Sequence, residues 1–431
     1  MADLQPVKGT RDFYPQDMRL RNWLFDIWRR TAHRFGFEEY DACVLESEEL
    51  YVRKAGDEIT GQLYNFEDKG GRRIALRPEM TPSLARMILQ RQKALNFPLK
   101  WFSIPQCFRY ERMTRGRKRE HYQWNMDIVG QAAQSAEVEI ISALLSALQA
   151  MGLGSEHVVL HLNDRRLLNA VLDHLGVPQP AHLPVMVVMD KRDKVSPAQL
   201  GELLAEQGLA PVQVAGLNRI LGMATLDALQ GELGALPVLD DLRRLLELLE
   251  RVGFGAYVAF DIAIVRGLSY YTGTVFEVRD RGAALRAICG GGRYDSLLSA
   301  YGGESIPAIG FGFGDVVILE LLSDLGLLPT LRSDVDYAVI PFSGQQAEPA
   351  MELGQRLRQL GFSANADFSG RKLKRALQHA DEIGARHALL LMPEEWARGE
   401  VVLRDMRSHT EARVAVDAFF EGLRSRPGQG A

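Results

Sequence analysis

The residues FRYERMTRGRKREHYQWNMDIVG (108–130) carry the strongest structural signal in this chain. Side chains in a β-strand point alternately to its two faces. One face of the expected strand 120–129 holds Tyr122, Trp124, Met126 and Ile128. The other face holds Gln123, Asn125 and Asp127. We therefore expect two strands, 100–111 and 120–129, joined by a basic loop, with a core on one side and a polar surface on the other.

The loop between these strands concentrates positive charge. Two acids, Glu111 and Glu120, accompany six basic residues: Arg109, Arg112, Arg115, Arg117, Lys118 and Arg119. Clustered cations repel each other unless an anion lies among them, so the loop predicts an anion or nucleotide site, the alternative being a solvated surface. The chain as a whole has a formal net charge of −4, which argues against general nucleic-acid binding and limits any nucleic-acid contact to such local patches. A second basic cluster, 371–375, is interpreted as a solvated surface.

Three further stretches combine glycine with polar or aromatic residues: IVRGLSYYTGTVFEV (264–278), CGGGRYDSL (289–297) and AIGFGFGD (308–315). Glycine lets a ligand approach the backbone closely. The spacing of Gly310, Gly312 and Gly314 is not that of a dinucleotide-binding turn, and the sequence contains no GxxxxGK[ST] phosphate loop. A nucleotide bound here therefore requires a different architecture.

The 431 residues predict two or three domains. Apolar periodicity indicates helices at 16–35, 137–151 and 316–325, and a strand-like piece follows the first of these at 37–46. Residues 165–250 form a mostly helical insertion in a first domain, 1–325. A linker at 326–333 precedes an α/β domain, 334–424, and a tail, 425–431, expected to be disordered.

Composition is that of a water-soluble globular protein, with 46% hydrophobic and 25% charged residues. No apolar run approaches the roughly 20 residues that cross a bilayer, and the N-terminus lacks a secretory signal. Cys43, Cys107 and Cys289 are far apart, without the spacing of a zinc or redox motif. These features predict a cytoplasmic protein with reduced thiols, no membrane association and no bound structural metal.

Five ordered motifs resemble those of class II aminoacyl-tRNA synthetases, and specifically the histidyl-tRNA synthetase family. They are KGTRDF (8–13), LRPEMTP (76–82), FRYE with its arginine loop and HYQWNMD (108–127), VRGLSYYTG (265–273) and GGRYD (291–295). The resemblance covers about residues 6–420 and implies an α+β catalytic domain built on an antiparallel sheet that holds ATP. It also implies a helical insertion directed to the tRNA acceptor stem, a C-terminal α/β anticodon-binding domain, and a homodimer formed through residues 20–50.

The resemblance also implies roles for individual residues. Arg109 and Arg266 would be catalytic, with Arg109 on the α-phosphate of ATP and Arg266 bridging that phosphate and the histidine carboxylate. Glu111, Arg117 and His121 would complete the ATP site, with Arg117 on the γ-phosphate or the tRNA end. The histidine site would comprise Glu79, Met80, Thr81, Arg109, Gln123, Asp127, Arg266, Tyr270, Tyr271 and Tyr294. Contacts to tRNA(His) would come from Arg112, Arg115 and Arg117, and Mg²⁺ would accompany ATP.

The sequence departs from the family pattern at several of these places. Val317 stands where the third class II motif usually has an arginine, so Arg117 or another basic residue must compensate at the γ-phosphate. Cys43 replaces a proline of the first motif, Ser269 replaces an aspartate, and His121 replaces the phenylalanine that stacks on adenine. Thr114 stands in place of a glutamine that helps to contact the 5′ end of the tRNA.

Two activities are compatible with the resemblance. The first is histidine–tRNA ligase activity, in which ATP and L-histidine form histidyl-adenylate and the histidyl group passes to tRNA(His). The alternative is a non-catalytic regulatory paralogue that acts with ATP phosphoribosyltransferase in histidine biosynthesis. The retained histidine motifs and C-terminal domain favour the ligase, because such paralogues typically lose the C-terminal domain and have eroded histidine motifs.

Overall fold

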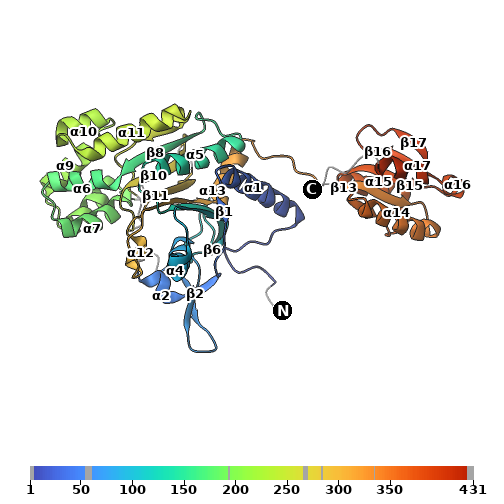
Figure 1. Cartoon of the computed structure of the whole chain (residues 1–431), viewed down its shortest axis with the longest axis horizontal. Coiled ribbons are helices and arrows are strands. Elements are labelled where there is room, and N and C mark those ends of the chain that lie inside the picture. Colours follow the sequence, from blue (N-terminus) through green and yellow to red (C-terminus); the bar gives the residue numbers. More distant parts are fainter. Residues whose placement is uncertain are drawn as a thin grey trace. The chain divides into compact units, whose positions relative to one another are not determined.

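The computed structural model describes residues 4–53, 61–192, 195–265, 270–282, 285–333 and 335–424. The chain divides into two compact units, with the main break between Leu328 and Pro329. Figure 1 shows both units with their elements labelled. Among the described residues no helix is long and apolar enough to cross a bilayer.

A large sheet forms the centre of the first unit. Its strands run, in spatial order, β1 (Glu38–Glu39), β5 (Leu99–Ser103), β7 (Glu120–Val129), β12 (Ala308–Gly314), β11 (Cys289–Arg293), β10 (Thr274–Asp280), β8 (Val158–Asp164) and β9 (Val258–Phe260). A further strand, β6 (Gln106–Phe108), pairs with the first part of β7. All neighbours from β5 to β8 are antiparallel, and the edge pairs β1–β5 and β8–β9 of this sheet are parallel. The antiparallel sheet expected from the sequence is confirmed.

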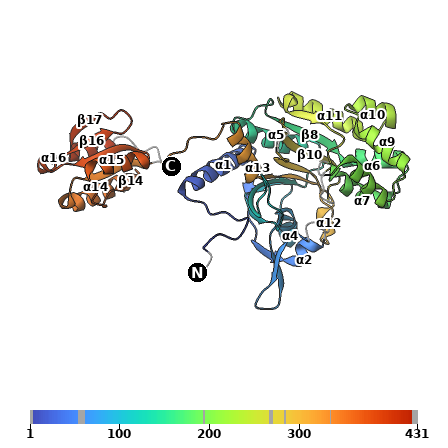
Figure 2. The ribbon, with the colours of Figure 1, turned by 180° about the vertical axis from the view of Figure 1, so that it is seen from behind.

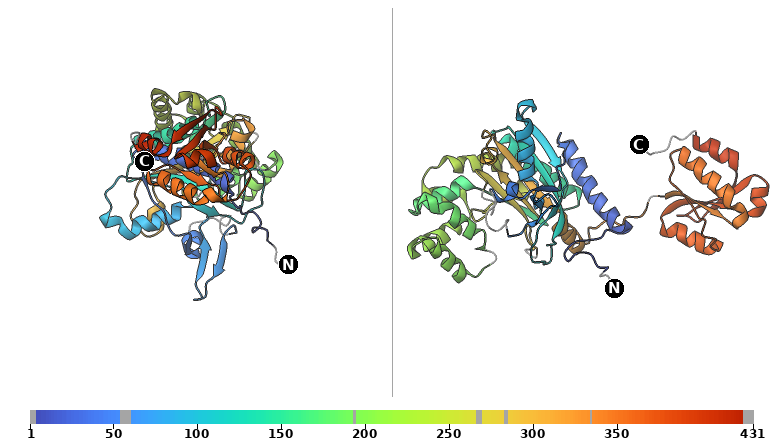
Figure 3. Two further views of the ribbon diagram at one scale, coloured as in Figure 1. Left: turned by 90° about the vertical axis from the view of Figure 1, so that its right-hand side faces the viewer. Right: turned by 90° about the horizontal axis from the view of Figure 1, so that it is seen from below.

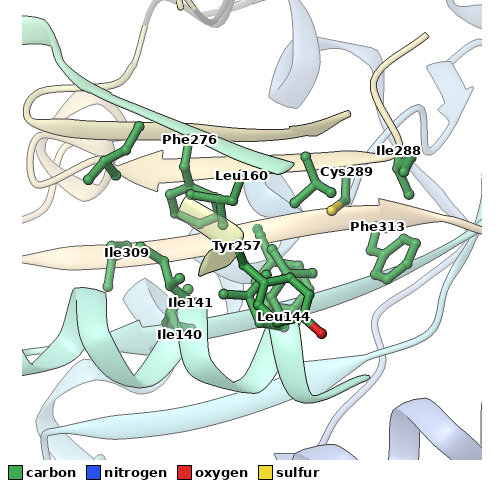
Figure 4. Close-up of a cluster of buried hydrophobic side chains, with 14 of the residues drawn as sticks. Ile140, Ile141, Leu144, Leu160, Tyr257, Phe276, Ile288, Cys289, Ile309 and Phe313 are labelled. Atoms are coloured by element: carbon green, nitrogen blue, oxygen red, sulfur yellow. The ribbon is translucent and has the colours of Figure 1, made fainter. Parts of the chain in front are cut away.

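Helices cover the apolar face of this sheet because β7 alternates as its sequence predicts. Trp124, Met126 and Ile128 enter one core with α1 (Pro15–Arg34), α5 (Ser135–Ala150) and α13 (Asp315–Asp324). Trp28 of α1 stacks on Trp124, with ring centroids 5.9 Å apart. Figure 4 shows Ile140, Ile141 and Leu144 of α5 against side chains of the neighbouring strands.

The opposite face of the sheet is only partly covered. The helices α4 (Thr81–Arg91) and α12 (Leu297–Ala300) form a smaller core there with Leu99, Val129 and Val275. Figure 2 shows α4 and α12 on the side of the sheet away from α5. A three-stranded sheet in the order β2 (Leu45–Ser47), β4 (Arg73–Leu76), β3 (Tyr64–Glu67) lies beside α2 (Glu48–Val52), and η1 (Gln92–Ala94) follows α4. The rest of this face stays open.

The helical insertion is confirmed and contains more helices than its sequence indicated. They are α6 (Arg165–His174), α7 (Gln179–Met189), α8 (Pro197–Glu206), α9 (Pro211–Leu221), α10 (Leu226–Leu233) and α11 (Pro237–Arg251), followed by η3 (Gly255–Tyr257). Figure 1 shows them gathered at the β8 end of the sheet. Within the insertion the sequence pattern indicates helical runs at 198–207 and 239–252, and α8 and α11 match these. The helix α7 has a proline near its start and Pro184 inside it, and α9 begins with Pro211.

The second unit is a five-stranded α/β sheet, as expected. Its strand order is β14 (Ala364–Ala366), β13 (Val335–Pro341), β15 (Ala385–Leu391), β16 (Glu400–Asp405), β17 (Glu411–Ala415). The helices η4 (Gly344–Gln346), α14 (Ala347–Gln359), α15 (Leu373–Glu382), α16 (Pro393–Ala397) and α17 (Val416–Arg424) complete it. Alternate residues of β13 pack on α14 and α17 on one side and on α15 on the other, and the right panel of Figure 3 shows these strands between helices.

Two local expectations were wrong. The single strand expected at 100–111 is interrupted at Ile104 and Pro105 and ends at Phe108, because proline has no N–H for a strand ladder. The strand-like piece at 37–46 is two separate strands, β1 and β2, which belong to different sheets. Local sequence does not reveal which sheet a short strand joins.

Candidate active site

One large cleft opens on the polar face of the central sheet, with a volume of about 1570 Å³. Its lining includes most of the residues singled out in the sequence: Glu79, Thr81, Arg109, Glu111, Arg117, His121, Gln123, Asp127, Tyr270, Tyr271 and Tyr294. They come from β7, from the loops before α4 and before β7, and from the segments before β10 and after β11. Segments up to 215 residues apart in sequence thus meet in one cavity.

The glycines of β12 leave room for the polar side chains of β7. Gly310 pairs with Asp127, and Gly312 pairs with Asn125. A Cβ atom added at Gly310 would lie 2.1 Å from Asp127 Oδ1, and one added at Gly312 would lie 1.7 Å from Gln123 Nε2. A larger residue at either position would displace a polar group from the cleft floor, which explains the repeated glycines of this strand.

One end of the cleft, here called the acidic pocket, is formed by Glu79, Asp127, Tyr270, Tyr271 and Tyr294. The Tyr294 hydroxyl donates a hydrogen bond to Asp127 Oδ1, and the Tyr270 hydroxyl donates one to Glu79 Oε2 at 3.3 Å. The rings of Tyr270 and Tyr294 meet edge to face at 5.9 Å. Asp127 and Tyr294 are almost wholly buried. The pocket therefore offers carboxylate acceptors between aromatic walls.

Burial controls the protonation of this pocket. It raises the pKa of Asp127 to about 7, although the hydrogen bond from Tyr294 acts in the opposite direction. It also raises the pKa of Glu79, against the lowering effects of the Arg109 charge and the Tyr270 hydroxyl. A carboxylate that is costly to ionise alone is stabilised when a cationic or N–H donor group enters beside it. The pocket is suited to a ligand that carries such donors.

The other end, here called the basic end, contains Arg109, Arg117, Lys118, His121 and Arg286. Arg109 is held by a 2.9 Å hydrogen bond from its Nε to the carbonyl oxygen of Pro78. Arg117 Nε lies 2.9 Å from Glu111 Oε2. Backbone contacts between Thr114 and Arg117 close a tight turn in which Gly116 has a φ of +73°. Such a cluster of guanidinium groups is suited to phosphate.

His121 stays neutral within this cluster. Burial lowers its pKa to about 3, and nearby guanidinium charges contribute further, in the order Arg109, Arg11, Arg286 and Arg117. An uncharged imidazole can stack on an aromatic ligand without repelling the surrounding cations.

A buried ionic network supports the start of β7 and was not anticipated. Arg11 Nε lies 3.1 Å from Glu120 Oε2, and Arg11 Nη2 lies 2.9 Å from Asp315 Oδ2 at the first turn of α13. Asp315 accepts a hydrogen bond from the Tyr122 backbone N–H at 3.0 Å. Burial raises the pKa of Asp315 to about 6, against the effect of Arg11. The network joins the N-terminal segment, β7 and α13.

Four of the residues singled out in the sequence are not in the described cleft lining. Met80 is wholly buried, with its sulfur 3.9 Å from Arg77 Nη1. Arg112 is exposed, and Arg115 pairs with Glu320 at 3.2 Å and with Asp324 at 2.5 Å, both on α13. Arg266 lies outside the described residues, so its expected convergence with Arg109 stays a prediction.

The cleft also contains residues that the sequence did not single out as functional. Glu277 and Arg279 of β10 form a 2.6 Å ion pair on its floor, and Leu183 and Val187 of α7 border it from the insertion. Arg286 joins the basic end from the connection between β10 and β11. No local motif marks these positions. Their place in the cleft follows from strand order and helix packing.

Comparisons with known proteins agree with this architecture. A family model described as histidyl-tRNA synthetase matches residues 9–314, and one described as anticodon binding domain matches residues 336–426. The chain is 44% identical over 413 residues to a chloroplastic/mitochondrial histidine–tRNA ligase of Arabidopsis thaliana, covering 96% of this chain and 85% of that protein.

Solved structures show the same fold. A crystal structure of histidyl-tRNA synthetase from Nostoc sp. PCC 7120 matches with a TM-score of 0.81 and 24% identity, over 99% of this chain and 100% of that one. A structure from Bacillus halodurans C, titled as an ATP phosphoribosyltransferase regulatory subunit/histidyl-tRNA synthetase, matches with a TM-score of 0.74 and 23% identity, over 90% and 99% of the two chains. The fold is therefore common to proteins given either name.

Proposed function

Because the chain belongs to the histidyl-tRNA synthetase family, we propose that it is a histidine–tRNA ligase that activates histidine with ATP and transfers it to tRNA(His). The observation that carries the proposal is the cleft itself. A pocket with buried carboxylates and phenols adjoins a cluster of guanidinium groups on one sheet face. Histidine and a nucleoside triphosphate require these two environments side by side.

The acidic pocket recognises histidine in this proposal. Asp127, Tyr271 and Tyr294 face the imidazole, and Tyr270 lines the same pocket. Glu79, Thr81 and Gln123 hold the ammonium group, with Met80 behind them. Buried acceptors that only an imidazole can satisfy reject analogues by roughly 10⁴-fold or more. The raised pKa of Asp127 supports this role, since an imidazole N–H restores the stability of the buried carboxylate.

The basic end binds ATP. Arg109 contacts the α-phosphate, Glu111 contacts the adenine edge, His121 stacks on adenine, and Arg117 contacts the γ-phosphate or the tRNA end. The histidine carboxylate is already an anion at neutral pH, so its attack on the α-phosphorus requires alignment and charge neutralisation rather than a general base. Arg266 bridges the two reacting groups.

Magnesium enters with ATP. Among the described residues no group of three or more acidic, histidine or cysteine side chains forms a ready-made metal site. Mg²⁺ is commonly held by substrate phosphates with one or two carboxylates. The ion would neutralise charge on the triphosphate and the departing pyrophosphate.

Transfer to tRNA uses surfaces outside the acidic pocket. Arg112 and Arg115 are exposed, so an RNA backbone can approach them, and the insertion borders the cleft. The second unit binds the anticodon. We assign residues 1–325 to the catalytic domain, 326–333 to a linker and 334–424 to the anticodon-binding domain, in a cytoplasmic homodimer.

The test is pyrophosphate exchange with each amino acid in turn, followed by charging of total tRNA. We expect pyrophosphate exchange to require histidine, and we expect tRNA(His) to be charged. Arg109→Ala should lower exchange by about 10²–10³-fold, because it removes a donor directed at the transition state. Arg266→Ala should abolish exchange with the fold intact, and near-normal exchange would refute that role.

The alternative, a non-catalytic regulatory paralogue, predicts the opposite result in the pyrophosphate exchange assay. A regulatory subunit would bind histidine without exchanging pyrophosphate and would have no use for an anticodon-binding domain. The match of residues 336–426 to the anticodon binding domain family favours the ligase, and so does the guanidinium cluster. Histidine binding with no exchange under any condition would establish the alternative.

A further inference from the structure

We propose that Arg286 binds the outer phosphates of ATP, beyond the α-phosphate. The residue lies in the connection between β10 and β11, outside the motifs by which the sequence resembles its family. This inference rests on the proposed function, because it names a further side chain that acts on the same substrate.

The first support is the position of the Arg286 side chain. A Cβ atom added at Gly116 would lie 3.2 Å from Val317 Cγ2, and 3.7 and 3.8 Å from Arg286 Cγ and Cδ. The stem of Arg286 and the methyl group of Val317 therefore meet at the tip of the turn 114–117. Val317 presents only methyl groups there, so of these two side chains only Arg286 carries a charge.

The second support is the order of charges along the cleft. Arg109 lowers the pKa of both Glu79 and His121, so within the basic end it is the arginine near enough to act on the acidic pocket as well. Arg286 also acts on His121 and packs against the turn that carries Arg117. If the α-phosphate lies at Arg109, the rest of the triphosphate extends towards the turn, where Arg117 and Arg286 stand.

The third support is chemical. Arg109, Arg117 and Arg286 all border the cleft, and a multiply charged anion among them would offset the repulsion between their charges. A guanidinium group presents a planar fork that matches two phosphate oxygens. Arg117 is paired with Glu111, and Arg286 brings a further guanidinium to this end of the cleft from a separate segment of the chain.

The decisive experiment compares the binding of ATP and AMP, without histidine, to the full chain and to Arg286→Ala. Calorimetry gives both affinities, and thermal unfolding verifies that the exposed substitution leaves the fold intact. Loss of a hydrogen bond to a charged group weakens binding by about tenfold to a hundredfold. We expect a loss of this size for ATP and none for AMP, because AMP lacks the outer phosphates. Arg286→Lys keeps the positive charge but not the planar guanidinium group. Its affinity for ATP should therefore lie between those of the unmodified chain and of Arg286→Ala.

Arg281→Ala is the matched control. Arg281 lies in the same connection and borders the same cleft, but its Nε and Nη2 donate to the backbone oxygens of Ser155 and Ala256. Its loss should leave ATP affinity unchanged within about twofold, since exposed charges are screened over about 10 Å.

Each other outcome overturns the assignment. Equal losses for ATP and AMP would place Arg286 at the base or ribose, and unchanged ATP affinity would remove it from the site. An equal loss in Arg281→Ala would mean that any cation in the cleft suffices. None of these results affects the proposed function, which fails instead if the unmodified chain shows no histidine-dependent exchange.

Discussion

The two ends of the cleft are built on different physical principles. In the acidic pocket the polar groups are buried and already bonded to one another, as in the pair of Tyr294 with Asp127. At the basic end the cations are more exposed and held mainly by their own anchors, such as Pro78 for Arg109 and Glu111 for Arg117. The pocket is preorganised for one small ligand, whereas the basic end provides charge for a larger and more flexible one. Selectivity is therefore expected from the first end and nucleotide affinity from the second.

Asp127→Asn should show most clearly that the two ends of the cleft bind different substrates. Removing one partner from a buried charged contact costs about 2–5 kcal/mol, so kcat/KM for histidine should fall on the order of 10²–10³-fold. The KM for ATP should stay close to that of the unmodified chain, because Asp127 lies at the other end of the cleft. Pyrophosphate exchange at varied histidine and varied ATP measures both, and an equal effect on both substrates would contradict the division.

Gly312→Ala should give a smaller effect confined to the floor of the acidic pocket. The added Cβ would lie 1.7 Å from Gln123 Nε2, so this flexible side chain must move away from the ligand ammonium. We expect the KM for histidine to rise about tenfold, as for one lost hydrogen bond to a charged group, with little change in unfolding temperature. Gly314→Ala is the matched control on the same strand, because a Cβ there meets nothing within 4 Å. Equal behaviour of the two variants would show that the glycines serve the strand rather than the pocket.

The smallest expected effect is on stability, where the two ends respond oppositely to pH. The pKa of Asp127 is about 7 in the folded protein against an ordinary 3.8, so the folded state binds more protons between these values. Its contribution to the free energy of unfolding falls as pH rises from 4 to 7. The pKa of His121 is about 3 against an ordinary 6.5, so the unfolded state binds more protons, and its contribution rises between pH 3 and 6.5.

Thermal unfolding of Asp127→Asn and His121→Phe between pH 4 and 7 tests this opposition. Relative to the unmodified chain, Asp127→Asn should gain unfolding temperature as pH rises, and His121→Phe should lose it, each by a few degrees. Tryptophan fluorescence reports mainly on the first unit, which contains Trp23, Trp28, Trp101 and Trp124, whereas Trp396 lies in the second. Parallel shifts in the two variants would exclude burial as the cause.

Several parts of the fold could be predicted because their signals are local. The alternation of β7 separates Trp124 and Met126 from Gln123 and Asp127, and the apolar spacing of α5 and α13 marks helices within one or two residues of their ends. The helix α7 of the insertion was not recognised, because the prolines near its start and in its interior interrupt a regular apolar face. The break at Pro105 was missed because strand pairing, not strand propensity, determines where β6 begins.

The sequence by itself determined the layered architecture, the polar face of β7 and, through its ordered motifs, the family. Only the tertiary structure decided that Gly310 and Gly312 lie opposite Asp127 and Asn125, and that Arg286, Val317 and Gly116 meet at one point. The reason is that periodicity within a segment is a property of neighbouring residues, whereas these contacts depend on the strand order β7–β12–β11–β10. That order brings together side chains separated by up to about 200 residues, and no single sequence motif specifies it.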